Sequence, residues 1–358
     1  MQKLFGAVYK NKKVFITGHT GFKGSWLSLW LTKLGAQITG YAVDIPTKPN
    51  HFNLLNLDIE TIMADVLDKQ KLALSIKKCK PDIVFHLAAQ PIVRRSYEEP
   101  IETLETNIMG TANVLESCRM AGGVKAIVII TTDKCYQDTG VKRGYKESDR
   151  LGGNDPYSAS KACAELIVSS YRNSFFNLDK FGKEHETLLA SARAGNVIGG
   201  GDWAKDRLIP DLVRAASQHK LTLIRFPNAV RPWQYVLEPL RGYLQLGEKM
   251  LLGKKEFADC WNFGPKNASG LAVKDVLKIA KDSWGDVEYK IQTDKTNPHE
   301  ANFLVLNSSK AKLLLKWQGV WESKTAIKKT ILWYKSYYEE GKVVSGESLD
   351  EYQKALGY

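Results

Sequence analysis

Short apolar runs alternate with longer amphipathic segments through the first half of the chain. These short, mainly apolar runs predict buried strands at residues 14–17, 37–43, 82–88 and 126–131. Segments of helical length lie between them, for example residues 24–34, 68–78 and 101–120. Strands that alternate with helices form βαβ units, so the pattern predicts an α/β fold with a doubly wound parallel sheet.

From about residue 187 the pattern becomes less regular. Residues 195–201 are rich in glycine, and prolines punctuate residues 210–239. We therefore expect a large domain over residues 1–186 and a smaller α/β lobe over residues 187–358, with some strands and helices returning to the large domain. The tail from residue 310 predicts packed helix, because apolar residues recur at helical spacing: Leu313, Leu314, Trp317, Ile327, Ile331, Leu332 and Trp333.

Composition places the chain among ordinary globular proteins. Its 358 residues are 44% hydrophobic and 25% charged. No apolar run has the length of a signal peptide or of a membrane span, so we expect a cytoplasmic protein. The five cysteines contain no CxxC pair, which predicts reduced thiols rather than disulfides or a metal site.

The net charge of +12 raises the question of nucleic-acid binding. The lysines are scattered, however, and no basic stripe is interleaved with aromatic residues. We expect no nucleic-acid partner. The alternative predicts a strongly salt-dependent affinity for DNA.

A glycine run follows the first predicted strand and opens the first predicted helix. It reads Thr17-Gly18-His19-Thr20-Gly21-Phe22-Lys23-Gly24. Gly18 permits a tight turn, Gly21 lets the backbone approach a pyrophosphate, and Gly24 lets the helix lie close to the sheet. In this context the run predicts a Rossmann-type dinucleotide site, whereas the alternative is a structural turn.

Asp44 ends the second predicted strand, twenty residues after Gly24. A carboxylate at this point accepts the ribose hydroxyls of NAD and repels the 2′-phosphate of NADP, so NAD is the expected cofactor. The alternative is a turn-forming Asp before Pro46. The remaining candidate cofactor-binding residues are Thr20, Phe22, Lys23, Asp65, Val66, Leu87, Ala88, Ala89, Asn107, Thr131, Tyr157 and Lys161.

Candidate catalytic residues follow the strand at residues 126–131 and begin a later helix. Thr132, Asp133 and Lys134 lie at the strand end, and Tyr157 and Lys161 lie four residues apart on one helical face. An ammonium at Lys161 is expected to lower the pKa of Tyr157 and so make the phenol a usable base. YxxxK by itself also fits a surface pair, but Pro156 and the preceding strand end strengthen the catalytic interpretation.

These residues resemble the extended short-chain dehydrogenase/reductase family over nearly the whole chain. In that family Tyr, Lys and Ser/Thr handle proton transfer while NAD accepts a hydride. Dehydratases that act on dTDP-glucose carry Thr-Asp-Glu at the strand end, whereas Thr132-Asp133-Lys134 resembles the CDP-glucose 4,6-dehydratases. Residues 85–91, 193–203 and 231–239 match the same enzymes.

The resemblance implies dehydration of CDP-glucose to CDP-4-keto-6-deoxyglucose. Asp133 would be the acid for the departing 6-hydroxyl and Lys134, in its neutral form, the base at C5. Alternatives are a dehydratase or 4-epimerase that uses another nucleotide sugar, and a non-catalytic dinucleotide sensor. The implied substrate-binding residues are Gln90, Arg94, Asn196, Trp203, Arg207, Arg231 and Gln234.

The family forms dimers through helices that correspond to residues 101–120 and 157–171 of this chain. We therefore expect a homodimer or a homotetramer.

Overall fold

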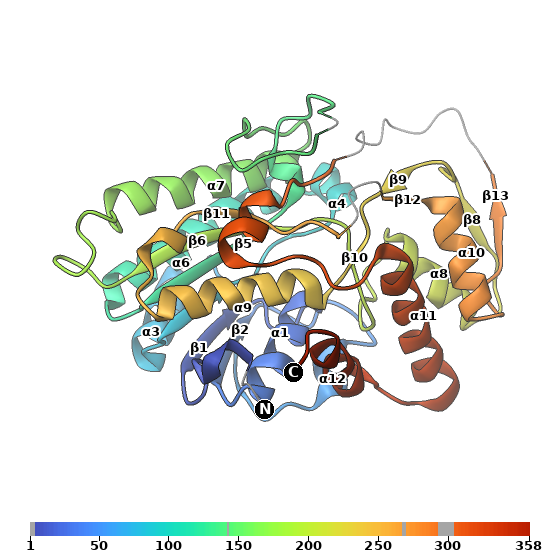
Figure 1. The fold of residues 1–358 in the computed structure, drawn as a ribbon, viewed down its shortest axis with the longest axis horizontal. Helices are drawn as coiled ribbons and strands as arrows, with labels where there is room; N and C mark the ends of the chain where they lie inside the picture. Colours follow the sequence, from blue (N-terminus) through green and yellow to red (C-terminus); the bar gives the residue numbers. More distant parts are fainter. Residues whose placement is uncertain (1–3, 142, 267–269, 293–303) are drawn as a thin grey trace.

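A seven-stranded parallel sheet forms the centre of the computed structural model (Figure 1). The structure describes residues 4–141, 143–266, 270–292 and 304–358. In spatial order the strands are β11 (Cys260–Asn262), β6 (Leu188–Arg193), β5 (Ala126–Thr131), β4 (Ile83–His86), β1 (Lys13–Thr17), β2 (Gln37–Ala42) and β3 (Glu60–Met63). The strand order reverses between β1 and β4, as in doubly wound sheets, and the predicted fold class is confirmed.

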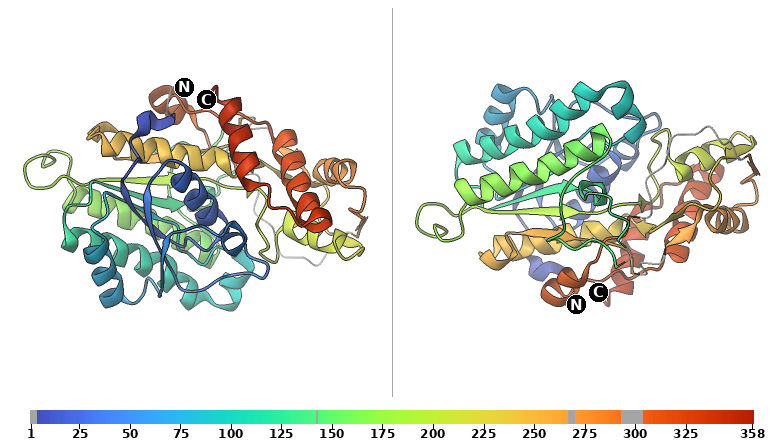
Figure 2. Two further views of the ribbon diagram at one scale, coloured as in Figure 1. Left: turned by 90° about the horizontal axis from the view of Figure 1, so that it is seen from below. Right: turned by 90° about the horizontal axis from the view of Figure 1, so that it is seen from above.

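Helices cover both faces of the sheet (Figure 2). One face carries α3 (Lys69–Cys79), α6 (Gly110–Ala121) and α7 (Pro156–Ser174), and the other carries α1 (Phe22–Lys33) and α9 (Leu237–Leu251), with α12 (Ser345–Ala355) packed beside α1. Strand residues alternate between the two cores. On β5, for example, Val128 faces α9 and its core, whereas Ile127 and Ile129 face the core under α6 and α7.

A smaller lobe lies at one end of the molecule (Figure 1). It contains α8 (Leu208–Ala216), α10 (Val273–Ser283) and α11 (Ser323–Glu340). Short strand pairs complete it: β8 (Thr222–Ile224) with β13 (Tyr289–Ile291), β9 (Val230–Arg231) with β12 (Leu271–Ala272), and β7 (Val197–Ile198) with β10 (Gln234–Tyr235). β6, β11 and α9 follow residue 187 in sequence but belong to the large sheet and its layer.

Two predicted segments differ from the structure at their ends or in their regularity, and two short helices were not predicted. β4 stops at His86 because its ladder with β1 ends at the Thr17 and His86 pair, after which Leu87 and Ala88 turn toward Gly18. The expected helix at residues 101–120 is divided into α5 (Pro100–Leu104), a π-helical turn η2 (Glu105–Met109) and α6. α2 (His51–Leu55) and α4 (Val93–Glu98) are short additional helices.

The expected packing of the tail is only partly correct. Ile327, Ile331 and Trp333 are buried on α11, but Leu332 is exposed. Leu313 and Leu314 are also exposed, because η5 (Ala311–Leu315) is a single π-helical turn that ends at Lys316 in the left-handed conformation. One turn is too short to bury a continuous apolar stripe.

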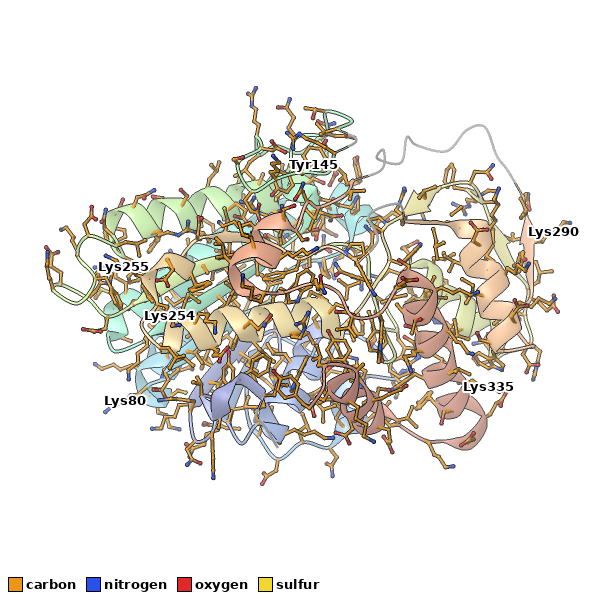
Figure 3. The ribbon with its side chains drawn as sticks, viewed as in Figure 1. Lys80, Tyr145, Lys254, Lys255, Lys290 and Lys335 are labelled. Atoms are coloured by element: carbon orange, nitrogen blue, oxygen red, sulfur yellow. The ribbon has the colours of Figure 1, made fainter. Side chains whose placement is uncertain are left out.

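The apolar length of the helices and the distribution of surface lysines bear on possible binding partners. Within the described ranges, no helix is both long and apolar enough to cross a membrane. Surface lysines are spread widely: Lys80, Lys254 and Lys255 lie toward one end of the molecule, and Lys290 and Lys335 lie toward the other (Figure 3).

Candidate active site

The glycine-rich turn at residues 18–24 brings the end of β1, the segment after β4 and the start of α1 into close backbone contact. Gly18 has a φ of +72°, and a Cβ atom there would lie 2.7 Å from the backbone nitrogen of Ala88. A Cβ atom on Gly24 would lie 2.1 Å from the carbonyl oxygen of Gly18. The first turn of α1 contains no acidic residue and begins at the carboxyl edge of the sheet. Its free N–H groups therefore fit an anionic pyrophosphate, as the motif predicts.

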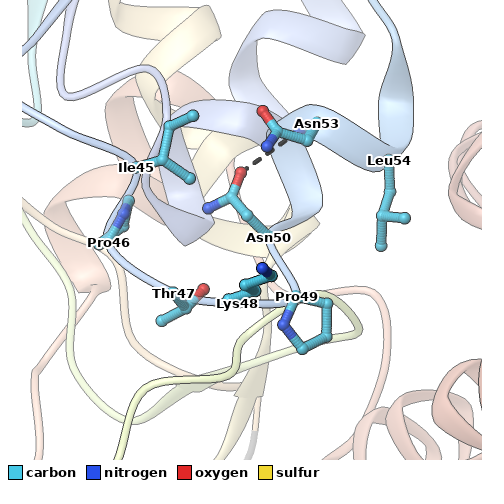
Figure 4. Close-up of a pocket in the computed structure, with 8 residues that line it drawn as sticks. All are labelled: Ile45, Pro46, Thr47, Lys48, Pro49, Asn50, Asn53 and Leu54. Carbon is cyan, nitrogen blue, oxygen red and sulfur yellow. Dashed lines mark hydrogen bonds between the residues drawn. The ribbon is translucent and has the colours of Figure 1, made fainter.

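The loop after β2 is tied to this turn. The Thr20 hydroxyl donates to the Asp44 carbonyl at 2.7 Å, and the Asn50 amide donates to the Thr20 carbonyl at 3.1 Å. The Asp44 carboxylate itself is exposed. Next to it, a hollow of about 630 Å³ is lined by residues 45–50, Asn53 and Leu54 (Figure 4). The loop thus offers a carboxylate and an open hollow beside the glycine turn.

Two further candidate cofactor-binding residues, Asn107 and Asp65, form hydrogen bonds with the protein backbone. Asn107, in the π-helical turn, donates to the backbone carbonyl of Gln90 and to Ser160 Oγ, and it accepts from the backbone N–H of Gln90. Both N–H donors of its side chain are therefore engaged. Val66 is buried against Gly110, and its neighbour Asp65 accepts from the Leu67 amide through Oδ1.

The end of β5 brings three polar side chains into different environments. Thr131, expected at the cofactor, donates to Glu165 of α7 at 2.5 Å. Thr132 donates to Asp133 Oδ1 at 2.8 Å. The Asp133 carboxylate also lies directly over Gly195, where a Cβ atom would be 2.1 Å from it, and the Asn196 amide is 3.4 Å from Oδ2. Asp133 is thus held in a fixed, buried position.

Lys134 contrasts with its neighbour. It is the middle residue of the 3-10 turn η3 (Asp133–Cys135), and its backbone N–H is directed at Thr132 Oγ1. Its side chain is half-buried, and across the described residues its ammonium has no hydrogen-bond or ion-pair partner. This side chain is therefore free to reach toward a substrate.

Helix α7 presents three ionisable side chains on one face. Asp155 caps the helix by accepting from the Ser158 backbone, and Pro156 occupies its first turn. Tyr157, Lys161 and Glu165 then follow at intervals of four residues, and all three are buried. The helix therefore places the predicted Tyr and Lys at the carboxyl edge of the sheet, close to Asp133 and Thr132.

The pKa of Tyr157 does not follow the prediction. Burial raises it to about 12, a hydrogen bond with Thr132 and the charge of Arg207 act to lower it, and Asp133 raises it. Lys161 has a pKa lowered to about 8 by burial, against the attraction of Glu165. The expected lowering of the Tyr157 pKa by Lys161 is wrong for this structure, because burial outweighs the nearby charges.

Lys23, a candidate from the glycine run, lies close to the candidate catalytic residues. Burial, together with the charges of Arg207 and Lys161, lowers its pKa to about 7, and the charge of Asp133 opposes this shift. Its ammonium is 6.0 Å from the Tyr243 ring centroid. Lys23 therefore belongs to the same cluster as Asp133, Lys161 and Arg207.

A buried ion pair lies beneath this cluster. Glu165 accepts from Arg193 at 2.8 Å and from Ser191 at 2.7 Å, in addition to Thr131. Burial acts to raise the pKa of Glu165, but these partners hold it below its usual value. Arg193 also donates to Tyr136, which stacks on Tyr145 (Figure 3) in the loop that follows η3. The ion pair thus joins α7, β5, β6 and this loop.

The predicted substrate-binding residues differ in their burial and in their partners. Arg207 pairs with Asp202 at 2.7 Å beside the cluster, whereas Arg94 pairs with Asp206 at the surface. Asn196, at a φ of +50°, contacts Asp133. Arg231 lies on β9 and donates to the Val230 carbonyl.

Three other substrate candidates are engaged inside the protein. The Gln234 amide donates to the carbonyls of Gly195 and Phe263. It therefore fixes the backbone of Gly195, against which the Asp133 carboxylate packs. Trp203 is buried among aromatic rings of α11 and donates to the Tyr338 hydroxyl. Gln90 donates to Ile92 and Thr103. These side chains shape the site through the residues that they hold.

Glu165, Arg193 and Gly195 were not identified as site residues from the sequence. Glu165 continues the four-residue spacing of Tyr157 and Lys161, which was an available signal. Arg193 and Gly195 stand in the segment next to Asn196, but their contacts join residues that are distant in sequence.

Comparison with known proteins agrees with this geometry. The sequence profile of the family described as GDP-mannose 4,6 dehydratase matches residues 15–330. CDP-glucose 4,6-dehydratase of Salmonella typhimurium is 46% identical over 97% of this chain and 98% of its own length. A probable dTDP-glucose 4,6-dehydratase of Sinorhizobium fredii is 26% identical over 96% of this chain and 100% of its own.

Solved structures share the fold. An epimerase from Methanothermobacter thermautotrophicus superposes with a TM-score of 0.80 at 23% identity, covering 93% of this chain and 95% of its own. The resemblance indicated by the sequence motifs is confirmed by the matched profile and by the Salmonella relative. The chain therefore belongs to the GDP-mannose 4,6-dehydratase family of enzymes.

Proposed function

We propose that this enzyme converts CDP-glucose to CDP-4-keto-6-deoxyglucose and uses a bound NAD that is regenerated in each turnover. The observation that carries the proposal is the buried strand end, where Asp133 is fixed by Thr132, Gly195 and Asn196 beside Tyr157. The choice of CDP-glucose rests on Lys134 and on the relative with 46% identity.

NAD fits the residues that would hold it. The close glycine contacts and the start of α1, whose first turn has no acidic residue, support pyrophosphate binding there, and we assign Asp44 to the ribose hydroxyls. When bound, NAD supplies the acceptor for hydrogen from C4 of the hexose and the donor for C6.

The chain's own residues supply the proton chemistry. Tyr157, as the phenolate, takes the proton of the 4-hydroxyl and becomes a neutral phenol, and the charge of Lys161 stabilises the phenolate. The resulting ketone acidifies C5. Lys134, free of protein partners among the described residues, removes the C5 proton in its neutral form, and Asp133 protonates the departing 6-hydroxyl.

Arginines and Lys23 suit the substrate's diphosphate. Arg207 and Lys23 lie within the catalytic cluster, and a guanidinium matches two phosphate oxygens at once. We assign Arg207, Arg231 and Asn196 to the nucleotide diphosphate, with Arg94 at the surface edge of the same region.

Incubation with a panel of nucleotide sugars tests the proposal. Purified protein is given CDP-glucose, dTDP-glucose, UDP-glucose or GDP-mannose, and loss of one water is followed by mass spectrometry. Selective dehydration of CDP-glucose is expected. Dehydration of a different sugar would replace the substrate, a 4-hydroxy product of unchanged mass would indicate an epimerase, and no reaction even with added NAD would remove the catalytic assignment.

We also propose a homodimer or homotetramer formed through the α5 to α6 segment and α7. Large apolar side chains are exposed there: Ile101, Met109, Met120 and Leu166. Light scattering during gel filtration should give at least twice the chain mass of 40.2 kDa, and a monomer would refute the proposal.

A further inference from the structure

His51 begins α2 and joins the cofactor side of the molecule to its last helices. Its imidazole is 1% exposed, with Nδ1 2.8 Å from Ser25 Oγ on α1 and Nε2 2.8 Å from Ser345 Oγ at the start of α12. Both serines are fully buried. One side chain on α2 thus connects it to two helices that lie far away in the sequence.

The other partners of the two serines fix the direction of each hydrogen bond. Ser25 donates its only hydroxyl proton to the Phe22 carbonyl at 2.8 Å, so its oxygen must accept from His51 Nδ1–H. A neutral imidazole then offers Nε2 as an acceptor, and Ser345 donates to it. Ser345 in turn accepts from Trp333 Nε1–H on α11 at 3.0 Å. One chain of hydrogen bonds therefore runs from α11 and α12 through His51 to the first turn of α1.

The surroundings of His51 keep the imidazole neutral, as this chain of hydrogen bonds requires. Its ring contacts the rings of Trp26 and Trp333, with centroid distances of 4.9 and 5.7 Å. Burial lowers the pKa of His51 to about 3. The imidazole therefore keeps one donor and one acceptor at neutral pH.

Both sides of the cofactor site are attached to this imidazole. Phe22 is the first residue of α1, whose first turn is the candidate pyrophosphate site. His51 directly follows Asn50, which lines the hollow beside Asp44 and donates to the Thr20 carbonyl at 3.1 Å (Figure 4). The imidazole therefore fixes the first turn of α1 and the hollow relative to each other.

Resting on the proposed use of NAD, we propose that His51 is a positioning residue for the cofactor, and that α11 and α12 act on the NAD site through it. The hydrogen bond from Ser345 orients the imidazole, and the imidazole sets the distance between α1 and α2. These side chains act without touching NAD. They keep the binding site formed in the absence of NAD, so less of the protein has to be ordered on binding.

The alternative is that His51 contributes to stability alone, by filling the space between aromatic rings and Gly201. A Cβ atom on Gly201 would lie 2.4 Å from Cγ of the imidazole, so the ring is closely packed there. This alternative predicts that substitution lowers the melting temperature and leaves the affinity of the folded protein for NAD unchanged.

The test compares Ser345→Ala and His51→Phe with the parent. Ser345→Ala removes the hydrogen bond from α12 and leaves every residue around the hollow intact. His51→Phe keeps an aromatic ring but removes both hydrogen bonds. Ser283→Ala is the control, because the Ser283 hydroxyl donates to the Ile279 carbonyl within its own helix, α10. Each protein is freed of bound dinucleotide, checked by thermal melting and titrated with NAD in a calorimeter.

Both Ser345→Ala and His51→Phe should raise the Kd for NAD by about tenfold, which is the size of effect that loss of a buried hydrogen bond produces. The turnover rate with CDP-glucose at saturating NAD should change by less than about threefold, because the loss lies in cofactor affinity. Ser283→Ala should match the parent in both quantities.

An unchanged Kd in Ser345→Ala would overturn the positioning role, whatever happens to the melting temperature. Ser345→Ala also decides the matter if His51→Phe does not fold. If the parent binds no NAD, the proposed cofactor is overturned and the role of His51 with it. If the parent binds NAD but dehydrates no nucleotide sugar, the proposed reaction is overturned, and the titrations still decide the role of His51.

Discussion

The glycine turn at residues 18–24 and the end of β5 at residues 131–134 lie at the same carboxyl edge of the sheet, but different forces fix them. The turn depends on missing side chains, since added Cβ atoms at Gly18 and Gly24 would meet backbone atoms. The strand end depends on buried polar groups, which hold Asp133 through Thr132 and Asn196 and hold α7 through Glu165.

This difference predicts different weaknesses. Steric packing of backbone is insensitive to pH and charge but tolerates no added volume. A buried polar network loses stability or activity when the polar group of one partner is removed, even if the substitution keeps the volume of the side chain. The following substitutions separate the two regions.

Asp133→Asn should have the largest effect. Loss of the acid is expected to slow water loss by about 10²- to 10⁴-fold, while NAD binding and the melting temperature stay near those of the parent. Steady-state rates with CDP-glucose and NAD titration give the measurements. Asp179→Asn, at an exposed loop position, is the matched control, and an Asp133→Asn rate within about tenfold of the parent would contradict the assigned role.

Glu165→Gln should lower the free energy of unfolding by about 3–5 kcal/mol, because it leaves the buried Arg193 charge without its partner. Urea unfolding measures this change. Glu184→Gln breaks an exposed pair with Lys180 and should cost less than about 1 kcal/mol. Replacing both residues, as Glu165→Leu with Arg193→Met, should recover part of the loss, and the account fails if the single substitution is harmless.

Gly24→Ala should destabilise the protein by about 1–3 kcal/mol and weaken NAD binding, because its methyl group would meet the Gly18 carbonyl at 2.1 Å. Gly285→Ala is the control, since a Cβ atom there meets nothing within 4 Å. Unfolding and NAD titration are measured at two pH values. A similar loss at both is expected, and equal tolerance of the two substitutions would refute the packing argument.

The pH profile should show the smallest effect. Burial lowers the pKa of Lys161 to about 8, so its ammonium is present below this pH and is lost as the pH rises through it. The value of kcat/KM should then fall by about tenfold per pH unit on the alkaline side. Lys161→Arg keeps its charge, so any activity that it retains should lack this decline. A parent profile that stays flat well above pH 8 would contradict the requirement for the ammonium.

The sequence predicted features that depend on neighbouring residues. The parallel sheet, the glycine run and the four-residue spacing of Tyr157 and Lys161 are local patterns, and the structure contains each of them. The packing of the Asp133 carboxylate against Gly195 and the pairing of Glu165 with Arg193 could not be predicted in this way. These contacts form only when β5, β6 and α7 pack together.

Side-chain roles were harder to predict than positions. Thr131 and Asn107 lie near the expected edge of the sheet, but their polar atoms bind Glu165 and Gln90. The net direction of the Tyr157 pKa was also missed, since the degree of burial is a property of the folded site rather than of the YxxxK spacing.

Tracing the hydrogen at C4 of the sugar tests the central claim most directly. CDP-glucose deuterated at C4 is converted by the enzyme, and the product is examined by nuclear magnetic resonance and mass spectrometry. The account predicts loss of one water, with the deuterium retained on C6 of the product. Deuterium found at C4 of a sugar of unchanged formula, or lost to solvent, would contradict an internal 4,6-dehydration.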